Sequence, residues 1–95
     1  MSAYLVFIRE KTLNAEELAT YMKMAPGTRA GHDSKVLARY GPQEDLEGSP
    51  TEGTVILEFP DAAAAKAWYD SPSYREAREH RLAGSIYRVI LVEGV

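Results

Sequence analysis

The chain has 95 residues, 45% of them hydrophobic and 26% charged, with a formal net charge of -3 and no cysteine. Its length predicts a single domain over residues 1–95, and the lack of cysteine excludes disulfides, thiolate metal ligands and a cysteine nucleophile. Basic residues are scattered along an acidic chain, which gives no positive field for a nucleic acid backbone, so we expect no nucleic acid partner.

The apolar start of the chain is too short for a signal peptide or a membrane span. It lacks a basic segment, and charged residues end the apolar run at Arg9 and Glu10. We therefore expect a cytoplasmic protein without a membrane partner, and a first strand over Ala3–Arg9, which is rich in β-branched and aromatic residues. Both faces of this strand are apolar.

The first helix is predicted to follow Asn14, which is a suitable N-cap, and to end at Pro26 and Gly27. Helical spacing predicts its buried stripe. The residues of that stripe are Ala15, Leu18, Ala19 and Met22.

Two strands and a second helix are predicted next. Lys35–Tyr40 and Thr54–Phe59 have strand patterns, and the polar, acidic segment Gln43–Gly53 connects them. Asp61 is expected to cap a helix through Tyr69. Its predicted apolar stripe is Ala64, Ala67 and Trp68.

A third helix and a last strand complete the chain. Ser71 before Pro72 favours a helix start, and the highly charged segment Pro72–Leu82 is expected to be mostly solvated. Its thin apolar line is Tyr74, Ala77 and Leu82. The last strand, Ser85–Glu93, is apolar on both faces over Val89–Val92.

The resulting β-α-β-β-α-β order predicts an α+β fold of the ferredoxin-like type. Right-handed crossovers place both helices on one face of a four-stranded antiparallel sheet. The other face then carries apolar residues from the first and last strands. A second copy of the chain would cover them, so we expect a homodimer through the sheet face. The alternative is a monomer, in which the charged residues at the strand ends keep this apolar face soluble. These residues are Arg9, Arg88 and Glu93.

Four segments resemble a known family. The segments LEG (residues 46–48), EFP (residues 58–60), AAKAWYDSPSY (residues 64–74) and VEG (residues 92–94) resemble the small bacterial family called domain of unknown function 1330. The resemblance implies a dimeric α+β barrel built on a ferredoxin-like fold, in a family without an established common reaction. Similar sequences tend to carry a basic residue before the third strand, where this chain has Glu52.

Cofactor motifs are absent from the sequence. It contains no phosphate loop, dinucleotide fingerprint, zinc-hydrolase motif or serine elbow, so we expect neither a cofactor nor a metal. The acidic residues between the second and third strands lack the spacing of a calcium loop, and a solvated loop is the better interpretation. These residues are Glu44, Asp45, Glu47 and Glu52.

Two residues are candidates for catalysis. His32 lies in a loop beside Asp33, whose carboxylate could orient an imidazole for acid-base chemistry. Arg39 is expected within the second strand, on the same face as Lys35 and Leu37, where its guanidinium could bind a ligand carboxylate. The alternatives are turn chemistry for His32 and, for Arg39, either a paired structural charge or an edge-strand charge.

Aromatic residues supply the candidate ligand-binding side chains: Tyr40, Trp68, Tyr69 and Tyr74. Trp68 is more typical of a core residue, whereas the hydroxyls of Tyr69 and Tyr74 could face a cleft. His80 lies among charged residues, which favours a solvated surface position.

These candidates support two functional hypotheses. The first is binding or transformation of a small organic acid or aromatic compound without a cofactor. The second is a non-catalytic dimeric regulatory or accessory module in which the same residues are structural. Haem binding is disfavoured because His80 looks too solvated to reach an iron atom.

Overall fold

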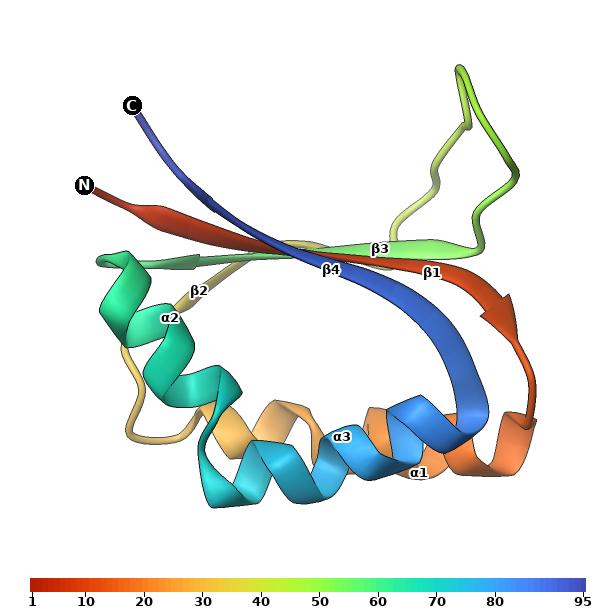
Figure 1. Cartoon of the computed structure of the whole chain (residues 1–95), viewed down its shortest axis with the longest axis horizontal. Coiled ribbons are helices and arrows are strands. Elements are labelled where there is room, and N and C mark those ends of the chain that lie inside the picture. The colour runs from red at the N-terminus through yellow and green to blue at the C-terminus, as the bar shows by residue number, and fades with distance from the viewer.

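The computed structural model describes all residues 1–95 and forms one four-stranded antiparallel sheet with its helices on one face (Figure 1). In chain order the elements are β1 (Ala3–Thr12), α1 (Ala15–Met24), a 3-10 helix (Pro26–Arg29), β2 (Lys35–Arg39), β3 (Gly53–Phe59), α2 (Ala62–Tyr69), α3 (Pro72–Gly84) and β4 (Ser85–Glu93). The strand order is β2-β3-β1-β4. This topology confirms the predicted ferredoxin-like fold. None of the helices has the length and hydrophobicity that a membrane-spanning segment needs.

All three α-helices begin where the sequence predicts, each after a capping residue. The Asn14 side chain accepts hydrogen bonds from the backbone N–H groups of Glu16 and Glu17, at 3.0 and 3.2 Å. Asp61 caps α2 through the N–H of Ala64, and Ser71 caps α3. Each cap satisfies a backbone donor that has no partner within its helix, so it fixes where the helix starts.

The hydrophobic core lies between the helices and the helix-facing side of the sheet, which we call the inner face. Leu5 and Phe7 of β1 are flanked there by Leu57 and Phe59 of β3. Trp68 of α2 stacks on Phe59 with ring centroids 5.7 Å apart, and it is 2% exposed. Half of the ten buried core residues are aromatic, and the burial of their rings stabilises the fold.

The buried faces of the helices differ in part from the predicted stripes. Ala15 and Ala19 of α1 are exposed and Tyr21 is buried, because α1 packs against α3 as well as against the sheet. In α2, Ala67 is exposed and Ala65 is buried. In both helices the buried residues are therefore partly offset from the predicted stripe.

The buried face of α3 differs most from the predicted one. Leu82 is 62% exposed, whereas Arg81, in the helix expected to be mostly solvated, is only 3% exposed. Tyr74, Ala77, Arg81 and Gly84 are the buried residues of this helix, spaced at three, four and three residues. Arg81 therefore belongs to the helical stripe that faces the core.

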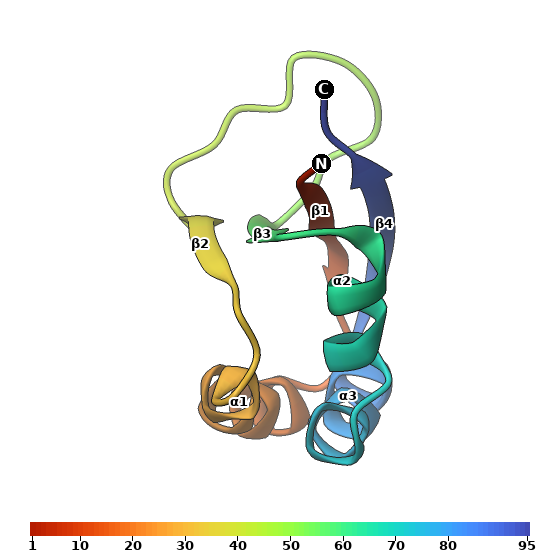
Figure 2. The ribbon, with the colours of Figure 1, turned by 90° about the vertical axis from the view of Figure 1, so that its left-hand side faces the viewer.

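The other side of the sheet, which we call the outer face, is apolar and uncovered. Val6 of β1 lies between Ile56 of β3 and Ile90 of β4, and Tyr4 is opposite Val92. Ile90 and Val92 are 42% and 48% exposed. Figures 1 and 2 show that the loop between β2 and β3 and both chain termini extend away from the helices, on the side of this outer face.

Close helix packing at Gly84 gives a first prediction. A Cβ atom at this position would lie 2.7 Å from the backbone N of Leu18 and 3.0 Å from the carbonyl O of Asn14. Gly84→Ala should therefore push α1 and α3 apart. We expect a loss of about 2 kcal/mol in the free energy of unfolding, because the overpacking exceeds the gain of at most about 1 kcal/mol in helix propensity.

Chemical denaturation measures this change, with Gly27→Ala as the control because a Cβ atom added at Gly27 would have no neighbour within 4 Å. Equal stabilities of the two variants would contradict the proposed packing of α1 on α3.

Candidate functional site

A small pocket lies on the inner face where β2 leaves a gap between itself and the helices, and we call it the β2 pocket. Its volume is about 60 Å³. The lining residues come from six elements and the residue after β2: Phe7, Tyr21, Pro26, Arg29, Val36, Arg39, Tyr40, Val55, Leu57 and Trp68. Aromatic and aliphatic side chains form most of the wall, and the two arginines are its charged groups.

A bulge in β2 brings Arg39 into this wall. Val36 pairs with Leu57 and Arg39 with Val55, while the register shifts between Val36 and Ala38. The shift reverses the alternation of side chains, so the predicted common face of Arg39 with Lys35 and Leu37 is wrong. Arg39 lies at the pocket, yet its side chain is exposed rather than embedded in the sheet.

Arg29 and Arg39 carry unpaired charges at the pocket. The ion pairs of the chain join Arg9 to Glu52, His80 to Glu17 and Arg88 to Glu10. Neither pocket arginine takes part in one. Their guanidinium groups are therefore free to bind an anion that enters the pocket.

Tyr40 closes one side of the pocket in a constrained conformation. Its backbone φ is +50°, in the left-handed region that residues other than glycine rarely adopt. Its hydroxyl forms a hydrogen bond of 2.5 Å with that of Tyr87, and the Arg9 guanidinium lies 5.2 Å from its ring centroid. Arg9 in turn pairs with Glu52 at 3.2 Å. These contacts hold the strained residue in place.

A second pair of tyrosines lies at the back of the pocket. Tyr21, which lines it, and Tyr74, which is fully buried, share a hydrogen bond of 2.8 Å between their hydroxyls. Burial raises the pKa of Tyr21, Tyr40 and Tyr74 above the usual value, because a phenolate loses its hydration there. All three hydroxyls are therefore neutral near pH 7 and act as hydrogen-bond donors and acceptors.

Arg81 lies beside these tyrosines and was not among the predicted site residues. Its guanidinium carbon is 5.9, 6.0 and 5.1 Å from the ring centroids of Phe7, Tyr21 and Tyr87. The helical spacing of Tyr74, Ala77 and Arg81 could have identified it. Its charge instead suggested a solvated position, because arginine is rarely buried without a partner.

The other predicted site residues are distributed over the molecule. Trp68 belongs to the core and also lines the β2 pocket, with its ring N–H donating to the Thr28 hydroxyl at 3.1 Å. Tyr69 lines a separate apolar cavity of about 170 Å³ between α2 and β4, and Tyr74 lines no cavity. His80 is half-buried and bonds to Glu17 at 2.7 Å, so it is not simply a solvated side chain.

His32 is not brought into the β2 pocket. It is half-buried in the loop after the 3-10 helix, and its backbone N–H donates to the carbonyl of Arg29 at 2.9 Å. No hydrogen bond or ion pair joins its ring to Asp33. The catalytic role of His32 therefore stays a prediction.

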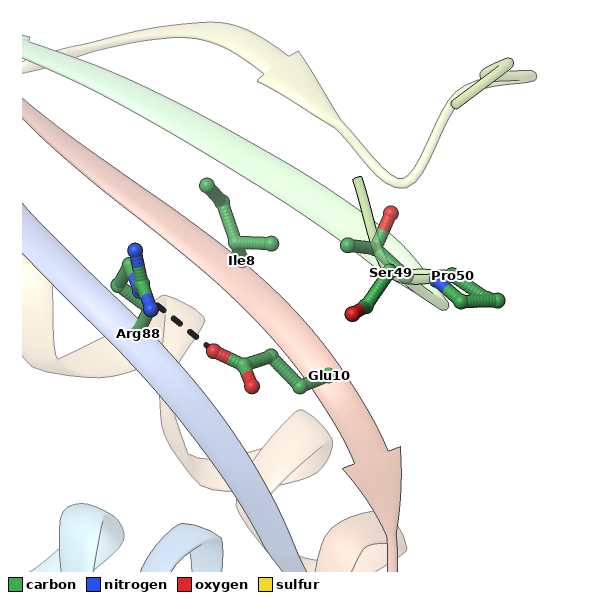
Figure 3. A pocket seen from close by; sticks show the side chains of 6 residues that line it. Ile8, Glu10, Ser49, Pro50 and Arg88 are labelled. Carbon is green, nitrogen blue, oxygen red and sulfur yellow. Dashed lines mark ion pairs between the residues drawn. The ribbon is translucent and has the colours of Figure 1, made fainter. Parts of the chain in front are cut away.

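A larger hollow lies on the outer face, between the sheet and the loop after β2 (Figure 3). Its volume is about 250 Å³, and Ile8, Glu10, Arg88 and the loop segment Ser49–Thr51 line it. Arg88 and Glu10 form an ion pair across β4 and β1 at 3.5 Å. Because its two charges compensate each other, this hollow offers less to a charged ligand than the β2 pocket does. No cluster of three or more side chains in the structure could hold a metal ion.

The position of Tyr40 gives a second prediction. A Cβ atom on Gly53 would lie 2.6 Å from the Tyr40 ring, so Gly53→Ala should displace that ring and break its bond to Tyr87. We expect a loss of about 2 kcal/mol in the free energy of unfolding, measured by chemical denaturation. Gly41→Ala is the control, since a Cβ atom added at Gly41 would have no neighbour within 4 Å. A Gly53→Ala variant as stable as this control would show that the ring is not locked.

Solved structures with similar folds cover nearly the whole chain. A protein of unknown function from Rhodopseudomonas palustris is 22% identical, with a TM-score of 0.75 over 99% of this chain and 82% of that one. A dimeric ferredoxin-like protein of unknown function from Jannaschia sp. CCS1 is 19% identical, with a TM-score of 0.73 over 99% and 100%.

A third similar structure has a described activity. SnoaB, a cofactor-independent oxygenase from Streptomyces nogalater, is 10% identical, with a TM-score of 0.66 over 99% of this chain and 93% of that one. At such identities the likeness concerns the fold alone. No curated protein shows significant sequence similarity to the chain.

A family model identifies the chain more directly. The model described as "Domain of unknown function (DUF1330)" matches residues 2–95, which confirms the resemblance seen in the sequence. The chain therefore belongs to the DUF1330 family.

Proposed function

We propose that this protein binds a small organic anion, of the carboxylate class, in the β2 pocket. The observation that carries the proposal is a concentration of unpaired positive charge at an aromatic pocket in a chain of net charge -3. Arg29 and Arg39 line the pocket without a carboxylate partner, and Arg9 and Arg81 lie against its tyrosine and phenylalanine rings. Glu52 is the one acid paired with this group.

The size of the pocket limits what it can enclose. Its volume of about 60 Å³ equals about two water molecules at roughly 30 Å³ each, so a carboxylate group or a very short acid fits inside. A larger ligand would leave its remaining atoms at the open side, near Arg39. An aromatic acid suits this arrangement because Tyr40 and Trp68 present ring surfaces to the pocket.

The lining favours binding over catalysis. No aspartate, glutamate or histidine lines the pocket, so no side chain there is an ordinary general base. The tyrosine hydroxyls can donate hydrogen bonds to an oxyanion but are poor proton acceptors near pH 7. SnoaB shows that this fold can accommodate an oxygenase, but the present pocket residues support a binding function first.

Arg39 supplies the test of this proposal. Isothermal titration with short aliphatic and aromatic carboxylates should detect binding, and Arg39→Ala should weaken it by roughly five- to tenfold. This is the effect of losing a charge-assisted hydrogen bond at a partly solvated site. Arg75→Ala is the matched control, because Arg75 is exposed on α3 and lines no pocket. Equal affinities of the two variants would exclude a role for Arg39, and no binding by the unaltered protein would refute the function.

We also propose that the protein is a homodimer in which two outer faces pack against each other. The contiguous apolar residues of that face support this assembly: Tyr4, Val6, Ile8, Ile56, Ile90 and Val92. An apolar sheet face of this kind is typical of an interface. The similar protein from Jannaschia is described as dimeric.

A charge on the outer face should disrupt this dimer. Each chain has a mass of 10.5 kDa, so light scattering after gel filtration should give about twice that value for the unaltered protein. Ile90→Lys should shift the mass toward one chain, because an unpaired ammonium would be buried in the interface.

The control is Leu82→Lys, which changes an exposed leucine on the opposite, helical side of the molecule and should leave the dimer intact. A monomeric unaltered protein, or a dimeric Ile90→Lys variant, would rule out the proposed interface.

A further inference from the structure

The guanidinium of Arg81 is a buried positive charge for which the chain provides no counter-ion. The residue is 3% exposed, forms no ion pair, and its Nε has no hydrogen-bond partner. Its polar side-chain contacts are with neutral tyrosine hydroxyls: Nη2 donates a long hydrogen bond of 3.5 Å to Tyr69, and Tyr74 is a further partner. Burying a charge in this way is costly unless other groups compensate it.

Part of the cost is offset within the fold. Arg81 lies in the last turn of α3, where the helix dipole favours a cation. The rings of Phe7, Tyr21 and Tyr87 surround its guanidinium at cation–π distances. These groups are dipoles and quadrupoles, so the net positive charge remains and acts on its surroundings.

Arg81 and the β2 pocket have neighbouring residues in common. Phe7 and Tyr21, which lie against Arg81, are also walls of the pocket. Because Arg81 is only 3% exposed, its interaction with these walls is weakly screened by dissolved ions. Arg39 differs in this respect, because its exposed charge is open to such screening.

We infer that Arg81 gives the β2 pocket a preference for the ionised form of its ligand that persists at high ionic strength. This inference rests on the proposed function and adds a ligand property to it: the site selects an organic oxyanion over a neutral molecule of the same shape. Arg29 and Arg39 attract the anion from solution, while Arg81 acts through space on the bound anion. At an effective dielectric constant of about 20, two unit charges about 10 Å apart change an affinity on the order of tenfold, which sets the size of the effect we expect.

The ligand pair acetate and acetamide tests this inference, because the two have nearly the same shape and differ in charge. Amide NMR shifts of the protein, followed during titration, give both dissociation constants. The measurement is made at low ionic strength and again at about 1 M, where the screening length is about 3 Å. A salt of a bulky sulfonate supplies the ions, since its anion is too large to enter the pocket.

For the unaltered protein, acetate should bind more tightly than acetamide, and roughly a tenfold preference should remain at the high ionic strength. Arg39→Gln should reduce the preference for acetate at low ionic strength. It should not change the preference that remains at high ionic strength. Arg81→Gln should remove the part of the preference that persists at high ionic strength, where the preference is the ratio of the two affinities measured on that same variant. The exposed Arg75→Gln should behave like the unaltered protein.

The inference is overturned if the preference for acetate disappears at high ionic strength, or if a folded Arg81→Gln variant keeps it. Should Arg81→Gln fail to fold, the salt dependence of the unaltered protein still decides. If salt abolishes the preference for acetate, this inference is refuted and the proposed function still stands. If neither these two ligands nor any other carboxylate binds, both the inference and the proposed function are refuted.

Discussion

Burial of the Arg81 charge among aromatic rings is the most demanding constraint in this structure. Ring faces and a helix C-terminus stabilise this cation in the protein interior, where it has no carboxylate partner. The surrounding residues Phe7, Tyr21, Tyr69 and Tyr87 come from β1, α1, α2 and β4. One guanidinium thus contacts four separate elements, and their mutual placement determines the shape of the β2 pocket beside it.

The sheet separates two kinds of surface. Its inner face carries the aromatic core, the tyrosine pairs and the arginines, so the chemistry that could recognise a ligand is gathered there. Its outer face carries aliphatic side chains, with the Arg88–Glu10 ion pair near one end. Alternation along each strand produces this division, because neighbouring residues point to opposite faces. A dimer through the outer face would leave the β2 pocket on the helical side of each copy.

The features that depend on local sequence could be predicted. Asn14, Asp61 and Ser71 cap their helices because a side-chain oxygen satisfies nearby backbone donors, whatever the rest of the chain does. The order of elements then restricted the topology to the ferredoxin-like arrangement. The apolar character of both faces of β1 likewise followed from residue alternation.

The features that depend on tertiary contacts could not be predicted in the same way. A bulge in β2 changes the face on which Arg39 lies, and a bulge leaves little signal in five residues of strand. The inward position of Arg81 agrees with helical periodicity, but only the three-dimensional arrangement of rings explains how its charge is tolerated. The candidate site was therefore found in part, through Arg39, Tyr40 and Trp68, while the tyrosine pairs and Arg81 required the structure.

The central claim is that the β2 pocket receives an organic anion, and a crystal structure with 4-bromobenzoate tests it most directly. Its aryl bromide does not react with protein side chains, so anomalous scattering from bromine locates the intact ligand. We expect the carboxylate in the β2 pocket beside Arg39 and Tyr40, with the bromine nearer to its open side. A 4-bromobenzoate molecule bound instead at the outer-face hollow beside Arg88, or an empty β2 pocket at saturating ligand, would contradict the account.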